Sequence, residues 1–287
     1  MSPRGKAAKA AESVKIGTCT IRFGRTKVMG IVNTTADSFS GDGLGGDEQA
    51  AITRGMMQFE QGADLVDVGG ESTRPGAEPV PARLEMARTI GVVETLARAR
   101  PGRVSIDTMK PEVAKSALLA GATIVNDVSG LRDPEMIEVV AEHGASAIVM
   151  HMLGDPRTMQ VRPRYKDVVG DIVSFLEDRV AAAEDGGIEP RRIIVDPGIC
   201  FGKTLEHNLE ILARLGEFKA IGKPVVIGVS RKSFIGKITG ADAGERIGGS
   251  VAAALVAAKN GASIVRVHDV RETVDALSVA SEIWGRM

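Results

Sequence analysis

The fold is indicated by the stretch Ala257-Ala-Lys-Asn-Gly261-Ala-Ser-Ile264-Val-Arg-Val-His268. It ends an apolar helical segment, turns at Gly261-Ala262 and continues into a short β-branched run. A glycine just past a helix can adopt the left-handed conformation that ends it, and an alanine permits close packing against a sheet. The run then finishes in the polar residues Arg266 and His268. A helix, a tight junction and a strand with a polar end therefore follow one another directly.

The same Gly-Ala junction precedes three other β-branched runs, at Gly62, Gly121 and Gly144. Such runs alternate along the chain with longer segments that carry apolar residues at helical spacing. The expected strands are 27–33, 65–70, 104–107, 123–126, 145–151, 193–196, 225–229 and 264–268. The expected helices are 47–61, 82–99, 111–120, 134–142, 167–185, 206–214, 244–260 and 271–285. Several strands are apolar without alternation, as in parallel sheets covered on both faces. Eight β-then-α units predict an α/β fold, a single (β/α)₈ TIM barrel, with an open doubly wound sheet as the alternative.

The N-terminal region precedes the first of these units. Residues 1–13 are basic and alanine-rich, and we expect a flexible tail, which leaves residues 14–287 for the barrel domain. Val14–Ile21 and Arg25–Met29 flank Arg22-Phe23-Gly24, which predicts a β-hairpin that plugs the bottom of the barrel. No apolar segment typical of a secretory signal follows the tail, and no run reaches the ~20 apolar residues of a membrane span.

The composition argues against several classes of partner. Lys and Arg number 36 and Asp and Glu 37, so the net charge of −1 attracts neither nucleic acid nor an anionic membrane over the whole surface. Cys19 and Cys200 form no disulfide framework and have no metal-ligand spacing, which favours a cytoplasmic location. The four histidines show no paired spacing typical of zinc sites.

Two glycine-rich segments resemble nucleotide-binding motifs without matching them. Gly41-Asp-Gly-Leu-Gly-Gly46 begins eight residues after the expected strand end at Asn33, whereas a dinucleotide site needs its first glycine at that end. Gly198-Ile-Cys-Phe-Gly202-Lys-Thr204 has three residues between its glycines, and a P-loop has four. We therefore expect a flexible loop at the first segment and no nucleoside triphosphatase at the second.

Polar residues stand at the C-terminal ends of all eight expected strands, where a barrel has its active site. Asp107, Asn126 and Asp196 supply acceptors, which suit a flat heterocycle with neighbouring N–H donors. The alternative for each is to cap the helix that follows. The residues that supply donors suited to a diphosphate are Arg74, Lys232, Arg266 and His268. Asn33 adds a neutral oxygen that can ligate Mg²⁺ beside phosphate oxygens.

We therefore predict a heterocycle site deep in the barrel and an anion site at its rim. Two long loops, 34–46 and 70–81, carry Thr, Ser, Gly, Pro and Arg residues. They are either disordered connections or lids that close over the substrate and exclude water.

Eight stretches, taken in order from about Lys27 to the C-terminus, resemble the dihydropteroate synthase family of pterin-binding enzymes. They are Gly30-Ile-Val-Asn33-Thr-Thr-Ala-Asp-Ser-Phe-Ser, Asp67-Val-Gly-Gly-Glu-Ser-Thr-Arg-Pro-Gly76, Ser105-Ile-Asp-Thr108, Asn126-Asp-Val-Ser-Gly130, Met150-His-Met, Asp196-Pro-Gly-Ile-Cys-Phe-Gly-Lys203, Gly228-Val-Ser-Arg-Lys-Ser-Phe-Ile-Gly236 and Arg266-Val-His268. Each stretch is moderately specific, and the ordered set is highly specific.

The resemblance implies a transferase of folate biosynthesis that joins 6-hydroxymethyl-7,8-dihydropterin diphosphate to p-aminobenzoate, with Mg²⁺ at Asn33. It implies that the pterin is bound by Asp107, Asn126, Asp196 and Lys232. It implies that the diphosphate is held by Asn33, Arg266 and His268. It implies that p-aminobenzoate is bound by Thr73, Arg74, Pro75, Phe201 and Ser233. The catalytic residues would be Lys232, Arg266 and His268. Family members usually form homodimers, and Val251–Ala258 is either the dimer face or a buried core helix.

The sequence departs from the family pattern in the first loop and after the sixth strand. Thr34 stands where valine is usual, Ala36 where proline is usual, and Asp42 is shifted by one residue. Cys200 replaces a usual glycine beside Phe201. Two alternative functions remain open: a methyltransferase that acts on methyltetrahydrofolate, and a non-catalytic pterin-binding homologue.

Overall fold

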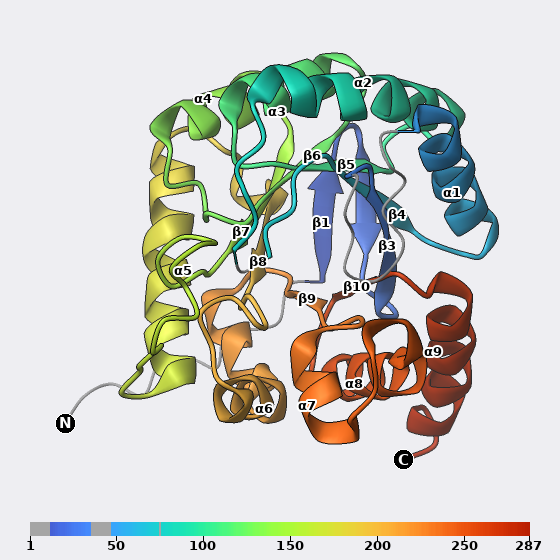
Figure 1. Ribbon diagram of the computed structural model, residues 1–287, viewed down its shortest axis with the longest axis vertical. Helices are drawn as coiled ribbons and strands as arrows, with labels where there is room; N and C mark the ends of the chain where they lie inside the picture. Colours follow the sequence, from blue (N-terminus) through green and yellow to red (C-terminus); the bar gives the residue numbers. More distant parts are fainter. Residues whose placement is uncertain (1–11, 36–46, 75) are drawn as a thin grey trace.

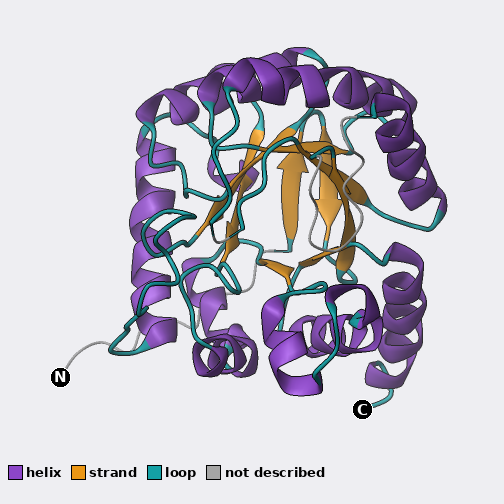
Figure 2. Ribbon diagram, viewed as in Figure 1, coloured by secondary structure: helices purple, strands orange, loops and turns teal. Residues whose placement is uncertain are grey.

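The computed structural model describes residues 12–35, 47–74 and 76–287. In these ranges a ring of parallel strands is surrounded by helices (Figures 1 and 2). The strands of the ring are β3 (Lys27–Asn33), β4 (Leu65–Gly69), β5 (Val104–Asp107), β6 (Ile124–Asp127), β7 (Ser146–Met150), β8 (Ile193–Asp196), β9 (Val226–Gly228) and β10 (Ile264–Val267). The helices are α1 (Glu48–Glu60), α2 (Ala82–Ala99), α3 (Pro111–Leu119), α4 (Pro134–Glu142), α5 (Val168–Asp185), α6 (Leu205–Ala213), α7 (Ser233–Thr239), α8 (Ile247–Lys259) and α9 (Val270–Trp284).

The strand order is that of a closed barrel. Each strand pairs in parallel with its neighbour in the order β8-β7-β6-β5-β4-β3-β10-β9. The ring closes between β8 and the residues before β9, where Val195 forms a parallel bridge with Val225 and its N–H donates to the carbonyl of Pro224 at 2.9 Å. Strands that follow one another in the chain lie side by side, so the predicted barrel is confirmed and the doubly wound sheet is excluded.

The four Gly-Ala junctions share one hydrogen-bonding pattern. Their glycines, Gly62, Gly121, Gly144 and Gly261, all have positive φ angles, between 55° and 110°. The alanine after each glycine donates its N–H to the carbonyl five residues earlier; for example, Ala262 donates to Ala257 at 2.9 Å. A left-handed residue followed by such a bond ends a helix and satisfies a terminal carbonyl. The repeated sequence signal is therefore a repeated helix terminus that turns the chain into the next strand.

The helix α7 is the main element that the sequence pattern did not predict. It has seven residues and follows directly on the polar stretch 230–232. Only Phe234 and Ile235 of it are buried, so it carries too few apolar positions to produce a helical periodicity. The helix ends at Gly240, which has a φ of 75°. None of the helices in the described ranges is long and apolar enough to cross a membrane.

The N-terminal hairpin is present, but its turn was predicted at the wrong place. β1 (Ser13–Ile16) pairs with β2 (Cys19–Arg22), and the turn lies at Gly17 and Thr18 rather than at residues 22–24. Gly17 has a φ of 55°, which a two-residue hairpin turn requires and which glycine adopts without strain. Residues 1–11 of the expected tail lie outside the described ranges, and Ser13 belongs to β1.

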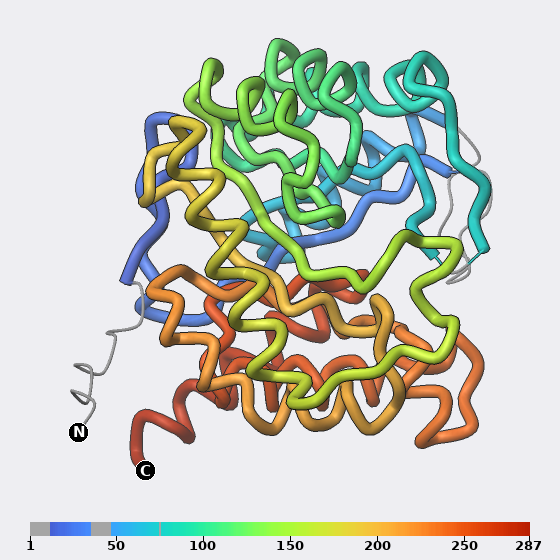
Figure 3. Tube along the Cα trace, turned by 90° about the vertical axis from the view of Figure 1, so that its left-hand side faces the viewer, coloured from blue at the N-terminus to red at the C-terminus, as the bar shows by residue number. Residues whose placement is uncertain are grey.

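The hairpin closes the N-terminal end of the barrel. Its buried residues Val14, Ile16 and Ile21 pack in one cluster with the first inward-facing residues of the strands. These strand residues are Met29, Leu65, Ile124, Ile148, Ile194, Val226 and Ile264. Figure 3 shows the hairpin, in dark blue, beside the segment that leads into β8, in yellow. The expected plug is therefore an apolar layer across the bottom of the barrel.

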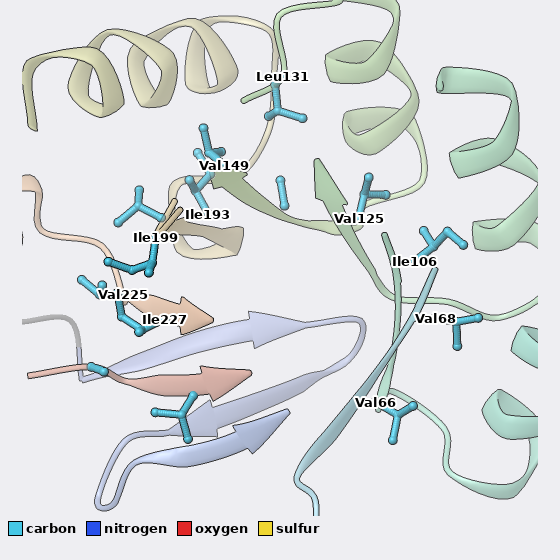
Figure 4. Packing of buried hydrophobic residues seen from close by; sticks show 14 of the residues in the cluster. Val66, Val68, Ile106, Val125, Leu131, Val149, Ile193, Ile199, Val225 and Ile227 are labelled. Atoms are coloured by element: carbon cyan, nitrogen blue, oxygen red, sulfur yellow. The ribbon is translucent and has the colours of Figure 1, made fainter. Parts of the chain in front are cut away.

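A second, larger core lies between the strands and the helices. Alternate strand residues such as Val66, Val68, Ile106 and Val125 belong to it (Figure 4). Because successive side chains of a strand point to opposite faces, Leu65 belongs to the barrel interior and its neighbours to the outer core. Burial on both faces explains why the strand sequences are apolar without alternation.

Replacement of Ile16 by alanine tests the hairpin plug. Ile16 is fully buried, so Ile16→Ala should lower the free energy of unfolding by ~2–5 kcal/mol, because a cavity remains. Urea denaturation followed by circular dichroism measures this loss. Ile283, which is 56% exposed on α9, provides the control Ile283→Ala, which should change stability by less than ~0.5 kcal/mol. Equal losses in the two variants would contradict a packed plug.

Candidate active site

A layer of polar side chains lies directly above the apolar plug. Each member stands two residues after a plug residue of its own strand, so strand alternation places it on the same inner face. The members are Asp67 after Leu65, Asn126 after Ile124, Asp196 after Ile194 and Arg266 after Ile264. Asp107 occupies the equivalent place at the end of β5, opposite Gly69 and Asn126 in the register. The predicted convergence of acceptors and cations at one end of the barrel is therefore observed.

The guanidinium of Arg266 lies at the centre of this layer. Its Nε donates to Oδ2 of Asp67 and its Nη2 donates to Oδ2 of Asp107, each at 2.6 Å. Asp67 also accepts from Nδ2 of Asn126 at 2.9 Å. The sequence placed Arg266 at the rim with the other donors; in the structure it lies deeper and is paired with two carboxylates. Its Nη1 makes no hydrogen bond to a described residue.

Asp67 is buried completely, and its second oxygen lacks a partner. Oδ1 of Asp67 and the hydroxyl of Ser105, its neighbour in the β4–β5 register, make no hydrogen bond in the described chain. The charge of Asp67 is therefore balanced from one side, through Arg266 and Asn126. Burial raises the pKa of Asp107 to about 7, with Arg266 acting against the rise and Asp67 adding to it. The carboxyl of Asp107 is thus close to its titration point at neutral pH.

Asp196 and Lys232 are close enough to influence each other's pKa. Oδ1 of Asp196 accepts from the N–H of Gly198 at 2.7 Å, so the carboxylate braces the loop that follows β8. Burial raises the pKa of Asp196, and the nearby ammonium of Lys232 is the main group that lowers it. Lys232 donates to the carbonyl of Ile199 at 2.7 Å and lies 5.0 Å from the ring of Phe201. Burial lowers the pKa of Lys232.

The other residues expected at a diphosphate lie at neighbouring strand ends. Asn33 is the last residue of β3 and is half-buried. His268 follows β10, and its Nδ1 lies 3.0 Å from the hydroxyl of Ser230, which also accepts from the backbone N–H of His268 at 3.1 Å. The imidazole is thus oriented by the segment after β9. Because β3 and β10 are paired in parallel, both residues lie at the C-terminal end of the barrel.

A cavity of about 320 Å³ adjoins Lys232 at the start of α7. Its lining includes Gln160, Cys200, Lys203, Leu205, Asn208, Ser233, Phe234 and Lys237. Of the described residues expected to bind an aromatic acid, Ser233 lines this cavity, and Phe201 follows the lining residue Cys200. Thr73 and Arg74 are half-buried in the loop after β4. Pro75, Ala36 and Asp42 lie outside the described residues.

Two departures from the family pattern have local consequences. Thr34 is buried, and its N–H and hydroxyl both donate to the carbonyl of Gly69, at 2.9 and 3.1 Å. Thr34, which stands in place of a valine, therefore has a hydrogen-bond partner for its buried hydroxyl. Cys200 has a φ of 69°, the left-handed region that favours glycine. A side chain at this position carries backbone strain, which explains why a glycine is the usual residue.

Sequence reasoning gave no role to two buried charged residues. Asp67 interrupts the apolar strand Leu65–Gly69, and a carboxylate in a strand buried on both faces was a signal that could have been used. Lys203 was noted as part of a near match to a P-loop and as the last residue of one family stretch, without a role of its own. It is 3% exposed and its ammonium turns inward, to Nδ1 of His151 and the carbonyl of Phe201, each at 2.9 Å. Thr204 caps α6 instead of serving a phosphate site.

Comparison with known proteins identifies a family. Residues 29–268 match the family model described as pterin binding enzyme. The dihydropteroate synthase of Escherichia coli K12 is 44% identical over 252 residues, which cover 88% of this chain and 89% of that protein. The Burkholderia cenocepacia dihydropteroate synthase complexed with 7,8-dihydropteroate is 43% identical with a TM-score of 0.88, covering 96% of this chain and 98% of that one. The Xanthomonas albilineans dihydropteroate synthase with 4-aminobenzoic acid is 42% identical with a TM-score of 0.87, covering 96% and 99%.

Replacement of Asp67 by asparagine tests the electrostatics of the polar layer. Asp67→Asn should lower the pKa of Asp107 from about 7, because a like charge is removed and Arg266 is left with one carboxylate. Carboxyl-carbon NMR titration of protein labelled at aspartate measures this pKa, with Asp107→Asn to assign the signal. The matched control is Asp64→Asn. Asp64 pairs with Arg25 before the start of β4, so this change should leave the pKa of Asp107 unaltered. A pKa of Asp107 that stays the same or rises in Asp67→Asn would refute the arrangement.

Proposed function

The chain belongs to the pterin-binding enzyme family, and from this we propose that it is a transferase of the dihydropteroate synthase type. It condenses 6-hydroxymethyl-7,8-dihydropterin diphosphate with p-aminobenzoate to give 7,8-dihydropteroate and diphosphate, a step of folate biosynthesis. The observation that carries this proposal is the polar layer, in which the acceptors Asp107, Asn126 and Asp196 surround Arg266 at one barrel mouth. The relatives that bear this name, and the product and 4-aminobenzoic acid in their structures, support it.

The pterin is bound by acceptors whose orientation is set from within the barrel. Asn126 donates its amide N–H to Asp67, so its amide oxygen is left to accept from the substrate. Oδ1 of Asp196 is occupied by Gly198, and its Oδ2 makes no hydrogen bond to a described residue. It is therefore available for the amino group and ring N–H of the pterin. Asp107 and Lys232 complete this pocket.

Charge that develops on the leaving diphosphate is stabilised by fixed cations. Asp67 and Asp107 hold one edge of the Arg266 guanidinium, and the remaining N–H groups are free to donate to the diphosphate. His268 is oriented by Ser230 for the same purpose. Preorganised donors stabilise a transition state without reorganising during the reaction. The C–O bond breaks toward the diphosphate, and the electron-rich pterin stabilises the cationic methylene that remains.

The arylamine attacks this methylene from the neighbouring cavity. Ser233 lines the cavity and takes the carboxylate of p-aminobenzoate, and Phe201 contacts the ring. Thr73, Arg74 and Pro75 of the second loop complete this site. Because water would capture a cationic methylene, closure of the loops over the two substrates favours transfer to the amine. Lys232, Arg266 and His268 are the catalytic residues of this scheme.

Replacement of Asp196 tests the reaction and the site together. The purified chain, supplied with the dihydropterin diphosphate, p-aminobenzoate and Mg²⁺, should release diphosphate and form 7,8-dihydropteroate. Asp196→Asn should lower kcat/KM by at least ~100-fold, because a charged acceptor of the pterin is lost. The control Asp178→Asn changes an exposed residue of α5 and should leave the rate unaltered. A methyltransferase or a non-catalytic homologue would release no diphosphate above the buffer rate, and that result would defeat the proposal.

We propose that Mg²⁺ takes part in the reaction, held by Asn33 together with diphosphate oxygens. The described residues contain no group of three or more His, Cys, Asp or Glu side chains that could hold a metal. The half-buried amide at the end of β3 therefore fits a cation that takes most of its ligands from the diphosphate and water. When bound, Mg²⁺ supplies neutralisation of the charge on the leaving group.

Chelation tests the metal. Treatment with EDTA should lower the rate of diphosphate release by at least ~10-fold, and added Mg²⁺ should restore it. Asn33→Leu should raise the Mg²⁺ concentration that gives the half-maximal rate. A rate that EDTA leaves unchanged would rule out a catalytic metal.

We also propose a homodimer and a cytoplasmic location. The helix α8 buries only Ser250, Ala254 and Ala257, and Val256 is 48% exposed. The expected face Val251–Ala258 thus presents apolar surface that a second copy could cover. Analytical ultracentrifugation tests the dimer. The free thiols of Cys19 and Cys200 suit a reducing compartment, and fractionation of cells tests the location.

A further inference from the structure

The segment between β8 and α6, residues 197–203, has an unusual backbone. Three alternate residues, Gly198, Cys200 and Gly202, have φ angles of 72°, 69° and 68°. A β-carbon on Gly198 would lie 1.9 Å from the carbonyl oxygen of His151, and one on Gly202 would lie 2.5 Å from Leu153. The segment therefore packs closely against the residues that follow β7. At Cys200 the backbone has a left-handed conformation that a residue with a side chain does not favour. Other groups must hold it there.

Side chains from outside the segment bind several of its backbone groups. The carbonyl of Cys200 accepts from Gln160 at 2.6 Å, and its N–H donates to Asn208 at 2.7 Å. The carbonyl of Gly202 accepts from the hydroxyl of Tyr165 at 2.8 Å. Gln160 and Tyr165 precede the segment in the sequence, and Asn208 follows it. Each contact fixes the orientation of one peptide group. Two further carbonyls, of Phe201 and Ile199, accept from lysines.

Lys203 binds the segment from beneath. Its Nζ lies 2.9 Å from the carbonyl oxygen of Phe201 and 2.9 Å from Nδ1 of His151. Burial lowers the pKa of His151 to about 2, so the imidazole is neutral and its Nδ1 accepts from Lys203. The ammonium therefore joins the end of β7 to the loop after β8. Lys203 is almost fully buried, a costly position for a cation unless it has such partners.

Lys232 binds the same segment through the carbonyl of Ile199, at 2.7 Å, and lies over the ring of Phe201. The two lysines are thus linked through three consecutive residues of backbone. A movement of the Phe201 carbonyl away from Lys203 shifts the Phe201 ring and the Ile199 carbonyl, which are the two contacts that fix Lys232. Burial lowers the pKa of Lys203 to about 7 and also lowers that of Lys232, and the nearby carboxylate of Asp196 opposes both shifts.

We propose that Lys203 is a positioning residue, which holds the loop 197–203 in the left-handed conformation that places Lys232 and Phe201 against the substrates. The inference rests on the proposed function and names a determinant of the same site. Lys203 contributes to the cavity lining, but its ammonium is bound to His151 and to the carbonyl of Phe201, and it acts through that carbonyl. The segment that nearly matches a P-loop is thus a loop whose own lysine binds one of its carbonyls. The ammonium of this lysine points into the protein and is not available to a phosphate.

The test compares Lys203→Met with Lys223→Met. Lys223 is a matched control, since its side chain is also largely buried, 12% exposed, and donates to the carbonyl of Pro190 at 2.8 Å, but it lies before β9, at the opposite end of the barrel. Methionine keeps the apolar stem and removes the donors. The affinity for 6-hydroxymethylpterin is measured by calorimetry, and the KM for p-aminobenzoate is measured in the product assay. Lys203→Met should weaken pterin affinity and raise this KM by ~10-fold each, and Lys223→Met should change neither.

A double-mutant cycle separates positioning from general stability. If Lys203 acts through Lys232, then Lys232→Met should weaken pterin affinity much less in the Lys203→Met background than in the unaltered chain. Additive effects, or a lower melting temperature with unchanged pterin affinity and KM, would overturn the proposal. Lys203→Gln retains amide donors and should give an intermediate loss; it also replaces Lys203→Met in every comparison should that variant fail to fold. The calorimetric measurement needs no turnover, so a chain that binds the pterin but forms no product would contradict the proposed function without deciding the role of Lys203.

Discussion

The site depends on the pairing of one buried guanidinium with two carboxylates. Arg266 lies inside the barrel between Asp67 and Asp107, and each contact measures 2.6 Å. A charge at this depth is tolerated only with a well-placed partner. Burial raises the pKa of Asp107 to about 7; Arg266 acts against this rise and the second carboxylate, Asp67, adds to it. Asp67 also accepts a hydrogen bond from Nδ2 of Asn126. This contact fixes the orientation of the Asn126 amide, so that its oxygen is the atom available to a substrate.

The barrel makes this pairing possible because it stacks layers along its axis. The hairpin β1–β2 closes the bottom with apolar side chains, and the next inward residues of β4, β6, β8 and β10 are polar. Alternation along each strand separates the two layers by two residues. The apolar layer keeps water away from the polar layer from below, which strengthens its ion pairs and shifts its pKa values. The substrates reach it only from the C-terminal mouth.

In the loop after β8, at the rim of the barrel, buried charged side chains also fix the positions of their neighbours. The backbone of this loop is held by side chains from the segment after β7, from α6 and from the segment after β9. Two lysines, Lys203 and Lys232, bind its carbonyls. The position of Lys232 therefore depends on this loop as well as on the segment between β9 and α7 to which Lys232 belongs. Cys200 adds strain at a place where glycine would add none, and the contacts of Gln160 and Asn208 hold its peptide in place.

The sequence by itself determined the architecture and the location of the site. Gly-Ala junctions, apolar runs and polar strand ends are local signals, and they predicted the barrel, most element bounds within one residue and the convergence of Asp107, Asn126, Asp196 and Arg266. The hairpin turn was misplaced because Gly17 and Arg22-Phe23-Gly24 are both plausible turns, and pairing decides between them. Only the tertiary structure showed that Asp67 binds Arg266, 199 residues away, and that Lys203 turns inward to His151. Which charges become partners depends on distances across the barrel, and no periodicity in the chain records these distances.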